Sequence, residues 1–240
     1  MKKIDMQIVA DIIKKSAIFL IIEIIAILLI TTFLFFINVT ITGWHLPIIT
    51  IISIGITSLF YKKDSIKINI VAILLGLIIF TGTTFIEGKI YDTTADGNTY
   101  HKLAIGALKN GWNPNYEDSK DFDKENGNPF DVSEENVNTK WVDHYAKGTE
   151  IFASVIYAFT GNIESGKGYT VLLMYIAFGI LFSYLYQNKR LNLLASLAIS
   201  ILLPFNAITV VQIFNYYVDG ALMISILLIL FACIVESIEN

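Results

Sequence analysis

No Lys, Arg, Asp or Glu occurs between Glu23 and Lys62, and this apolar run constrains the fold more than any other feature of the chain. The run is too long for one membrane span, which needs about 20 apolar residues. Residues 38–47, which include glycine, tryptophan and histidine, supply a turn within it. Backbone groups inside a bilayer must bond to one another, so such runs fold as helices. The sequence therefore predicts an all-α integral membrane protein.

The composition supports this fold class. Hydrophobic residues make up 55% of the 240 residues and charged residues only 16%, against about 25% charged in an ordinary soluble domain. Charge is concentrated in residues 89–150, where seven basic and twelve acidic side chains give a net −5. No basic patch is interleaved with aromatic residues, so no nucleic-acid partner is expected. The single cysteine, Cys233, lies in an apolar run, which excludes a disulfide framework and a thiolate metal site.

Six segments are expected to cross the membrane as helices. Each is predominantly apolar, and about 20 residues at about 1.5 Å each suffice for a hydrocarbon core of about 30 Å. The six are 16–38, 46–61, 68–86, 169–187, 191–214 and 216–235. Pro204 is expected to end or kink the fifth helix near Leu203. Residues 4–13 should form a short helix at the membrane surface, and the thirteen residues 151–163 are too few to cross and should re-enter the membrane.

The distribution of lysine and arginine predicts how the chain is oriented. These residues precede the first span, separate the second from the third and follow the fourth, whereas the turns at 38–47 and 204–216 contain none. Because short cytoplasmic segments are enriched in Lys and Arg, both termini are expected in the cytoplasm and the acidic insert outside the cell membrane. Three regions follow: 1–86 with three spans, 87–168 as one large extracytoplasmic loop with short amphipathic and re-entrant helices, and 169–240 with three further spans.

The densest group of reactive side chains, YDTTADGNTYH at 91–101, follows the third expected span. Asp92 and Asp96 are four residues apart and are followed by Tyr100 and His101 at the expected membrane surface. A carboxylate with an orienting partner can act as a general base. The alternative is a solvated loop with an Asp-Gly turn.

A second group, WVDHYAKG at 141–148, precedes the short apolar segment. His144, Tyr145 and Lys147 would stand at the head of that helix, where a lipid phosphate can meet the positive end of a helix dipole. The alternative is anchoring at the membrane interface by Trp141, Tyr145 and Lys147.

A third group, QIFNYYVDG at 212–220, lies between the last two expected spans. Tyr217 and Asp219 are its candidate substrate ligands, against the alternative of an ordinary turn. In the expected topology this group lies on the same side of the membrane as Asp92 and Asp96. The sequence therefore predicts one site formed from three distant segments.

Three other features are weaker. Residues 161–168 (GNIESGKG) have P-loop spacing, but Gly168 stands where a Mg²⁺-binding Ser or Thr belongs, so no nucleotide site is predicted. Glu23 lies within a span, where an acid is costly and suggests function, but a single such residue is thin evidence for a transport pathway. His101 and His144 have no metal-specific spacing with the aspartates. No metal or other cofactor is therefore predicted, with a divalent cation left as the alternative.

In the order of its motifs the chain resembles bacterial members of the polytopic C-type glycosyltransferase superfamily. The resemblance covers roughly residues 80–225: YDTTADGNTYH with GWNP, then HYAKG before an apolar helix and NIESGK, then QIFNYYVDG after a proline-containing span. It implies an enzyme that takes a sugar from a polyprenyl-phosphate carrier, with an aspartate of the first large outer loop as catalytic base. That aspartate maps best to Asp96, with Asp92 as its rival. Two extra spans precede the loop and fewer follow it than in that family, which leaves open that the chain is an N-terminal portion of a longer protein.

The expected function is a membrane glycosyltransferase of cell-envelope glycan synthesis. Asp96 would remove the proton of an acceptor hydroxyl, while Lys147 and His144 stabilise the departing phosphate. The expected partners are a lipid-linked sugar donor, a glycan or lipid acceptor, and membrane lipids. The alternatives are a lipid-linked-oligosaccharide flippase or small-solute transporter, which would place ionisable residues at the bilayer midplane, and a non-catalytic subunit of an envelope assembly.

Overall fold

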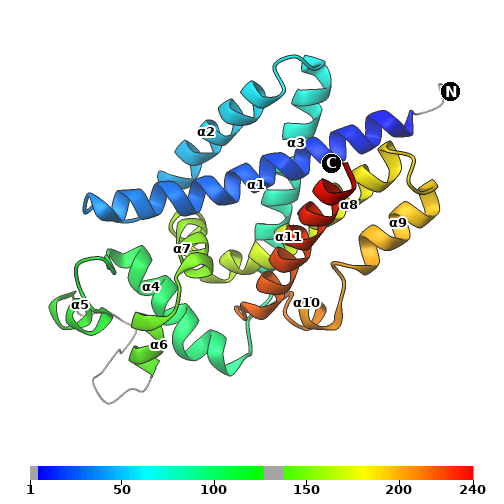
Figure 1. Cartoon of the computed structure of the whole chain (residues 1–240). Helices are drawn as coiled ribbons and strands as arrows, with labels where there is room; N and C mark the ends of the chain where they lie inside the picture. The colour runs from blue at the N-terminus through cyan, green and yellow to red at the C-terminus, as the bar shows by residue number, and fades with distance from the viewer. Residues whose placement is uncertain (1–4, 127–137, 240) are drawn as a thin grey trace.

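The computed structural model describes residues 5–126 and 138–239, and within these ranges the chain is helical throughout, without a β-strand (Figure 1). The all-α prediction is confirmed for this part of the chain. A π turn, η1 (Gly97–His101), precedes α4, and a 3-10 helix, η2 (Ile163–Gly168), precedes α8. The α-helices are α1 (Met6–Phe36), α2 (His45–Phe60), α3 (Ile66–Glu87), α4 (Lys102–Asn110), α5 (Ser119–Asn126), α6 (Asn138–His144), α7 (Gly148–Thr160), α8 (Tyr169–Gln187), α9 (Leu193–Leu202), α10 (Ala207–Val211) and α11 (Asp219–Glu239).

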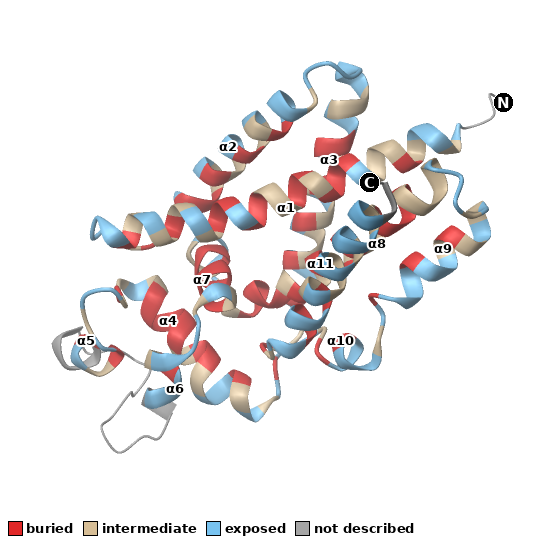
Figure 2. Ribbon diagram, viewed as in Figure 1, coloured by how far each residue is buried: buried red, intermediate tan, exposed pale blue. Residues whose placement is uncertain are grey.

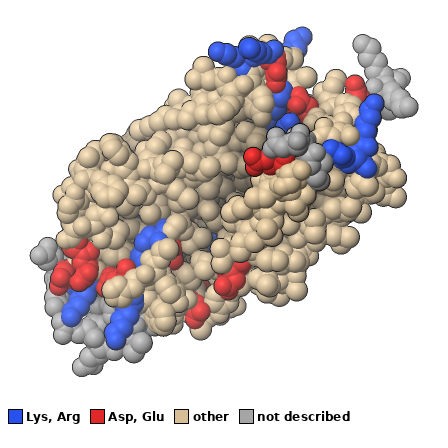
Figure 3. All heavy atoms as spheres, in the orientation of Figure 1, with Lys and Arg blue, Asp and Glu red and all other residues tan. Residues whose placement is uncertain are grey.

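Among the described residues, four helices are long and apolar enough to cross a membrane: α1, α3, η2 continued by α8, and α11. With 31 residues, α1 is about 46 Å long, well beyond a hydrocarbon core of about 30 Å. The apolar helices α2 and α9 are shorter, at 16 and 10 residues. Figure 3 shows charged side chains gathered at two opposite ends of the molecule, with a broad, mostly uncharged band between them. This distribution is typical of an integral membrane protein.

The long helix α1 joins two elements that were expected to be separate. Asp5 caps its N-terminus by accepting a backbone N–H two residues along at 2.9 Å, and the helix continues until shortly before Asn38, whose φ is 57°. The described residues of the expected surface helix at 4–13 therefore form the first turns of α1 and not a separate helix. The physical reason is Lys15, which is buried and pairs with Asp64 of the α2–α3 connection at 2.8 Å, so these charged turns pack against protein.

The fifth expected span, 191–214, is not one helix. α9 ends before Pro204, because proline has no N–H for the helical ladder and its ring clashes with the preceding turn. Asn206 then caps α10 by accepting two backbone N–H groups at 3.1 and 3.2 Å. The predicted break near Leu203 is confirmed. With 10 residues, α9 is only about 15 Å long, too short to cross a bilayer unaided.

The short apolar helix α7 lies in the interior of the molecule (Figure 2). Residues 151–156 are all buried, and the helix packs against α4, η2, α1 and α2. Gly161, in the left-handed conformation with φ 69°, ends it. Its 13 residues span about 20 Å, so α7 is too short to cross a bilayer. The length of the segment 151–163 had predicted this. α7 instead forms a buried support for the loops around it.

The two ends of the bundle differ in chemistry (Figure 1). One end holds the start of α1, the C-terminal end of α11, and the α2–α3 and α8–α9 connections. The basic residues Lys62, Lys63, Lys189 and Arg190 belong to those connections. The opposite end holds α4–α6, the α1–α2 connection and the start of α11. The candidate site residues lie at this second end.

Candidate functional site

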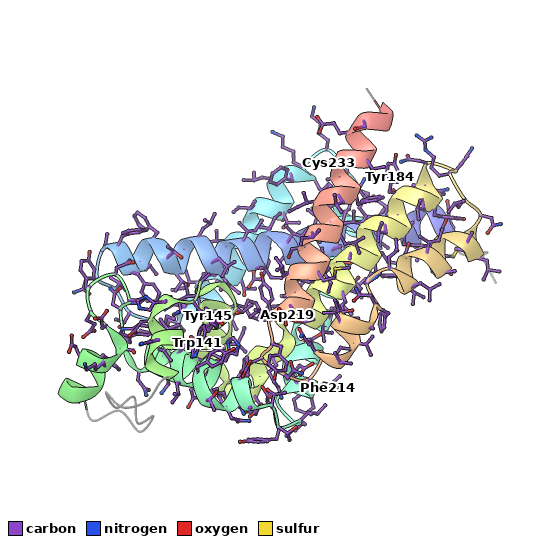
Figure 4. The ribbon with its side chains drawn as sticks, turned by 60° about the horizontal axis from the view of Figure 1, so that its bottom comes forward. Trp141, Tyr145, Tyr184, Phe214, Asp219 and Cys233 are labelled. Atoms are coloured by element: carbon purple, nitrogen blue, oxygen red, sulfur yellow. The ribbon has the colours of Figure 1, made fainter. Side chains whose placement is uncertain are left out.

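Three distant segments of the chain meet at the end of the bundle that contains α4–α6. The carboxylate of Asp92 accepts a hydrogen bond from the backbone N–H of Tyr216 at 2.9 Å, which joins the loop after α3 to the loop before α11. The ring of Tyr100 lies 5.5 Å from that of Tyr145 and 6.3 Å from that of Trp141, centroid to centroid. Figure 4 shows Trp141 and Tyr145 side by side, with ring centroids 4.9 Å apart. The three groups singled out in the sequence are therefore close together in space.

Asp92 is fully buried, and both oxygens of its carboxylate are engaged. Oδ1 accepts hydrogen bonds from N and Oγ1 of Thr94 at 2.8 and 2.7 Å, and Oδ2 accepts the N–H of Tyr216. The backbone N–H of Asp92 donates to Glu164 at 3.1 Å, and its carbonyl accepts from Asn98 at 2.8 Å. A carboxylate without exposed surface has no access to a substrate proton, so this geometry suits a structural tie between loops.

A buried ionic network lies beneath the loop that contains Asp92. Glu164 accepts hydrogen bonds from Lys102 and, at 2.8 Å, from Lys167, and Lys167 also donates to the carbonyl of Ile90. All three charged side chains are buried. Removing one partner of such a network leaves an uncompensated charge in the interior, which is strongly destabilising. The network therefore fixes α4, η2 and the loop relative to one another.

The segment with P-loop spacing, 161–168, belongs to this structural network. A Cβ on Gly166 would lie 2.6 Å from a side chain of α7, and one on Gly168 would lie 2.9 Å from a side chain of α3. These glycines allow close packing between helices. The lysine of the motif, Lys167, is already paired with Glu164. The glycines and the lysine of this segment therefore have structural roles in the packing of η2.

Asp96 immediately precedes the π turn η1. The next residue is a glycine of necessity, because a Cβ on Gly97 would lie 2.0 Å from Oδ2 of Asp92. Single π turns are frequent at functional sites. The side chain of Asp96 is partly exposed, and its Oδ2 accepts a hydrogen bond from the hydroxyl of Tyr100 at 3.1 Å. In contrast to Asp92, Asp96 keeps one carboxylate oxygen free of hydrogen bonds from the described residues.

Tyr100 and His101 are the last two residues of η1, which begins directly after Asp96. Burial, reinforced by the hydrogen bond to Asp96, raises the pKa of the Tyr100 phenol above its usual value of 10.0, so the hydroxyl stays a hydrogen-bond donor. His101 is almost fully buried, and its Nδ1 lies 2.7 Å from Oε1 of Glu150. No hydrogen bond from a described residue reaches Nε2 of His101. A carboxylate thus fixes the orientation of the imidazole through one nitrogen and leaves the other available.

The α6–α7 connection contains the second group of candidate residues. Lys147 caps the N-terminus of α7, and its Nζ donates to the carbonyl of Tyr145. Desolvation lowers the pKa of the Lys147 ammonium below 10.5, an effect opposed by Glu150 and Asp143. His144 is exposed and makes no hydrogen bond to another described residue. Lys147, unlike His144, adds its charge to the positive end of a helix, where an anion would bind.

The side chain of Gln212 holds the two ends of the third group of candidate residues together. Its Nε2 donates to Oδ2 of Asp219 at 3.0 Å, and its Oε1 accepts the next backbone N–H of α11 at 2.6 Å. Asp219 is exposed in the first turn of α11 (Figure 4). Tyr217 is half-buried and is one of the groups that raise the pKa of Tyr100. These residues form the wall of the site that comes from the last two helices.

No metal-binding group is found in the described ranges 5–126 and 138–239. No three His, Cys, Asp or Glu side chains there are arranged to hold an ion. Nδ1 of His101 is paired with Glu150, and His144 is exposed, with no hydrogen bond to another described residue. The divalent-cation alternative therefore has no ligand set in this part of the chain.

Four residues of the site were missed in the sequence: Lys102, Glu150, Glu164 and Gln212. All four are buried; Lys102, Glu150 and Glu164 are bonded to partners from other segments, and Gln212 is bonded to Asp219 of its own segment. Glu150 opens an apolar helix and Gln212 follows an apolar run. A polar side chain beside such a run is costly to bury unless it is bonded. That position is the signal that would have identified them.

Comparison of the chain with protein-family models, with curated proteins and with solved structures gives no match. Its function is therefore argued from the order of its motifs and from the geometry of the site.

Proposed function

We propose that this chain is a membrane glycosyltransferase of the C-type, which transfers a sugar from a polyprenyl-phosphate donor to an acceptor hydroxyl on the extracytoplasmic side, in cell-envelope glycan synthesis. One contrast supports the proposal most: Asp92 is buried and fully bonded, whereas Asp96 is accessible and held by Tyr100. A general base needs access to a proton and a rigid support. Asp96 has both, because Asp92 fixes the loop from which it projects.

The proposed reaction is a single displacement at the anomeric carbon. Asp96 takes the proton of the acceptor hydroxyl as that oxygen bonds to the anomeric carbon. The bond between the anomeric carbon and the phosphate oxygen breaks, and its electron pair leaves with the lipid phosphate. Lys147 and the N-terminus of α7 stabilise the developing charge on that phosphate. Attack from the face opposite the leaving group inverts the configuration of the sugar.

The proposed topology has six passes, with both termini in the cytoplasm and α4–α6 outside. α2 and the α9–α10 pair supply the two passes beyond the four long helices. The basic residues of the α2–α3 and α8–α9 connections lie at the end opposite the site, which supports this orientation. With 16 residues, α2 is about 24 Å long, so this pass needs local thinning of the bilayer.

A transporter or lipid-linked-oligosaccharide flippase is the second candidate, and Glu23 favours it. Glu23 is buried in α1, where its Oε1 accepts a hydrogen bond from Thr50 of α2 at 2.6 Å and its Oε2 accepts none of hydrogen-bond length from a described residue. Ionisable residues within a span suggest a transport pathway. Glu23→Gln separates the candidates, because it should leave sugar transfer intact but abolish transport. A non-catalytic subunit of an envelope assembly would show neither activity.

The experiment is incubation of the purified full chain in nanodiscs with a panel of polyprenyl-phosphate sugars, with release of the lipid phosphate as the readout. Wild-type protein should release it from at least one donor when an acceptor is present. Lys147→Ala should raise the donor KM and slow the release. Asp118→Asn, an exposed aspartate of the same loop, is the matched control and should behave as wild type. No release from any donor, with protein that melts cooperatively, would refute the proposal.

A further inference from the structure

Three aromatic rings form a cluster next to Asp96. Tyr100 comes from η1, Trp141 from α6 and Tyr145 from the α6–α7 connection, and their centroids lie 4.9–6.3 Å apart. Trp141 and Tyr145 are 43% and 42% exposed. The hydroxyl of Tyr100 is bonded to Asp96. We infer that this cluster, the aromatic platform, binds the sugar ring of the acceptor by stacking.

The chemistry of a pyranose matches that of the platform. One face of the ring presents C–H groups, which pack on the π-face of an aromatic side chain, while the rim presents hydroxyls. The platform offers two rings that are each about two-fifths exposed, and a stacked sugar would cover their apolar faces. At its edge, Asp96 has an oxygen free to accept from a hydroxyl. A sugar stacked on Trp141 and Tyr145 would thus present a rim hydroxyl to the proposed base.

The charge of the loop limits the class of sugar that the aromatic platform can bind. Asp96 lies at the edge of the platform, where its carboxylate accepts from Tyr100, and Asp143 stands between Trp141 and Tyr145 in the chain. A uronate or a phosphorylated sugar would be repelled by this field. The acceptor site therefore fits an uncharged pyranoside.

Anchoring at the membrane interface is the competing role for exposed Trp and Tyr. Trp44, in the α1–α2 connection, shows how such an anchor differs: it is 74% exposed and makes no ring contact with a described residue. The platform rings instead pack on one another, and Tyr100 is tied to a carboxylate. Trp44 is therefore the matched control for Trp141.

Saturation-transfer NMR with methyl pyranosides tests the inference without donor or turnover. The full chain in nanodiscs should transfer saturation to ring C–H protons on one face of a neutral pyranoside, and less to methyl glucuronide. Trp141→Ala should weaken binding about 3–10-fold, the effect of losing one aromatic contact. Trp141→Phe should restore most of it, and Trp44→Ala should change nothing. In a Trp44→Phe background, which keeps the buried Trp112, headgroup-brominated lipids should quench the protein with Trp141 hardly more than a protein that also carries Trp141→Phe.

The outcomes separate this inference from the proposed function on which it rests. No saturation of any neutral pyranoside, an unchanged signal in Trp141→Ala, or strong quenching by brominated lipid would overturn the aromatic platform. Sugar transfer with an unchanged acceptor KM in Trp141→Ala would do the same while leaving the glycosyltransferase in place. One-sided saturation lost in Trp141→Ala, from a protein that releases no lipid phosphate, would retain the platform and remove the enzyme.

Discussion

Replacing Asp92 or Asp96 by asparagine makes the same chemical change, yet the structure predicts a large loss of stability for Asp92 and almost none for Asp96. The buried carboxylate of Asp92 accepts three hydrogen bonds, at 2.7, 2.8 and 2.9 Å. Asparagine has one acceptor oxygen, so its NH₂ group would face either the Tyr216 N–H or the two donors of Thr94. A hydrogen bond to a charged group contributes about 1.5–3 kcal/mol, and a buried donor without a partner costs about 1–3 kcal/mol. We therefore expect Asp92→Asn to lower the free energy of unfolding by about 2–4 kcal/mol.

Asp96→Asn should change stability little, because the amide oxygen can still accept from Tyr100 and the side chain is partly exposed. For a chain of this size 1 kcal/mol shifts the melting temperature by about 2–4 °C, which gives a fall of about 4–16 °C for Asp92→Asn and about 1–2 °C for Asp96→Asn. The assay is intrinsic-fluorescence melting of both variants in one detergent at one scan rate. A wild-type melting temperature for Asp92→Asn, together with lost activity, would refute this assignment and make Asp92 the base.

Lys147 has a lowered pKa, so the phosphate affinity contributed by its charge should be lost as pH rises through that value, and the donor KM should climb at a lower pH than for an ordinary lysine. Lys147→Arg should keep the KM flat to higher pH, and identical KM–pH profiles would contradict this. Lys167→Ala should destabilise the fold by about 3–5 kcal/mol, because it leaves Glu164 without one of its two lysine partners. The loss should appear as a lower melting temperature. Neither the wild type nor this variant should bind ATP. Saturable ATP binding lost in that variant would be the contrary result. After replacement of Cys233, a cysteine at Asp118 should react with an impermeant thiol reagent on intact cells and one at Asp64 should not, and the reverse pattern would invert the topology.

The helices were predictable because apolar runs in a membrane leave the backbone no other structure. The break at Pro204 was predictable for the same local reason, since proline removes a helical hydrogen bond wherever it stands. The continuity of α1 was not predictable. Its early charges look like those of a surface helix, and only the long-range pairing of Lys15 with Asp64 shows that they pack against protein.

The site was predictable as a set of segments but not as a set of roles. The predicted order of the spans puts Asp92, Asp96 and Asp219 on one side of the membrane. The distinction between Asp92 and Asp96 depends on the N–H of Tyr216, 124 residues away, and no local pattern encodes that contact. The role of Glu150 was not predictable for the same reason, because its partner His101 lies 49 residues earlier. Buried polar pairs of this kind are properties of the fold.

The most direct test of Asp96 as the catalytic base is single-turnover release of lipid phosphate by wild type and Asp96→Asn in nanodiscs, at equal amounts of folded protein and with saturating acceptor. Loss of a general base typically costs about 10²–10⁴-fold in rate. We predict a loss of that size with donor affinity unchanged, because the substitution keeps the shape of the side chain and removes its basicity. Equal rates for the two proteins would contradict the assignment.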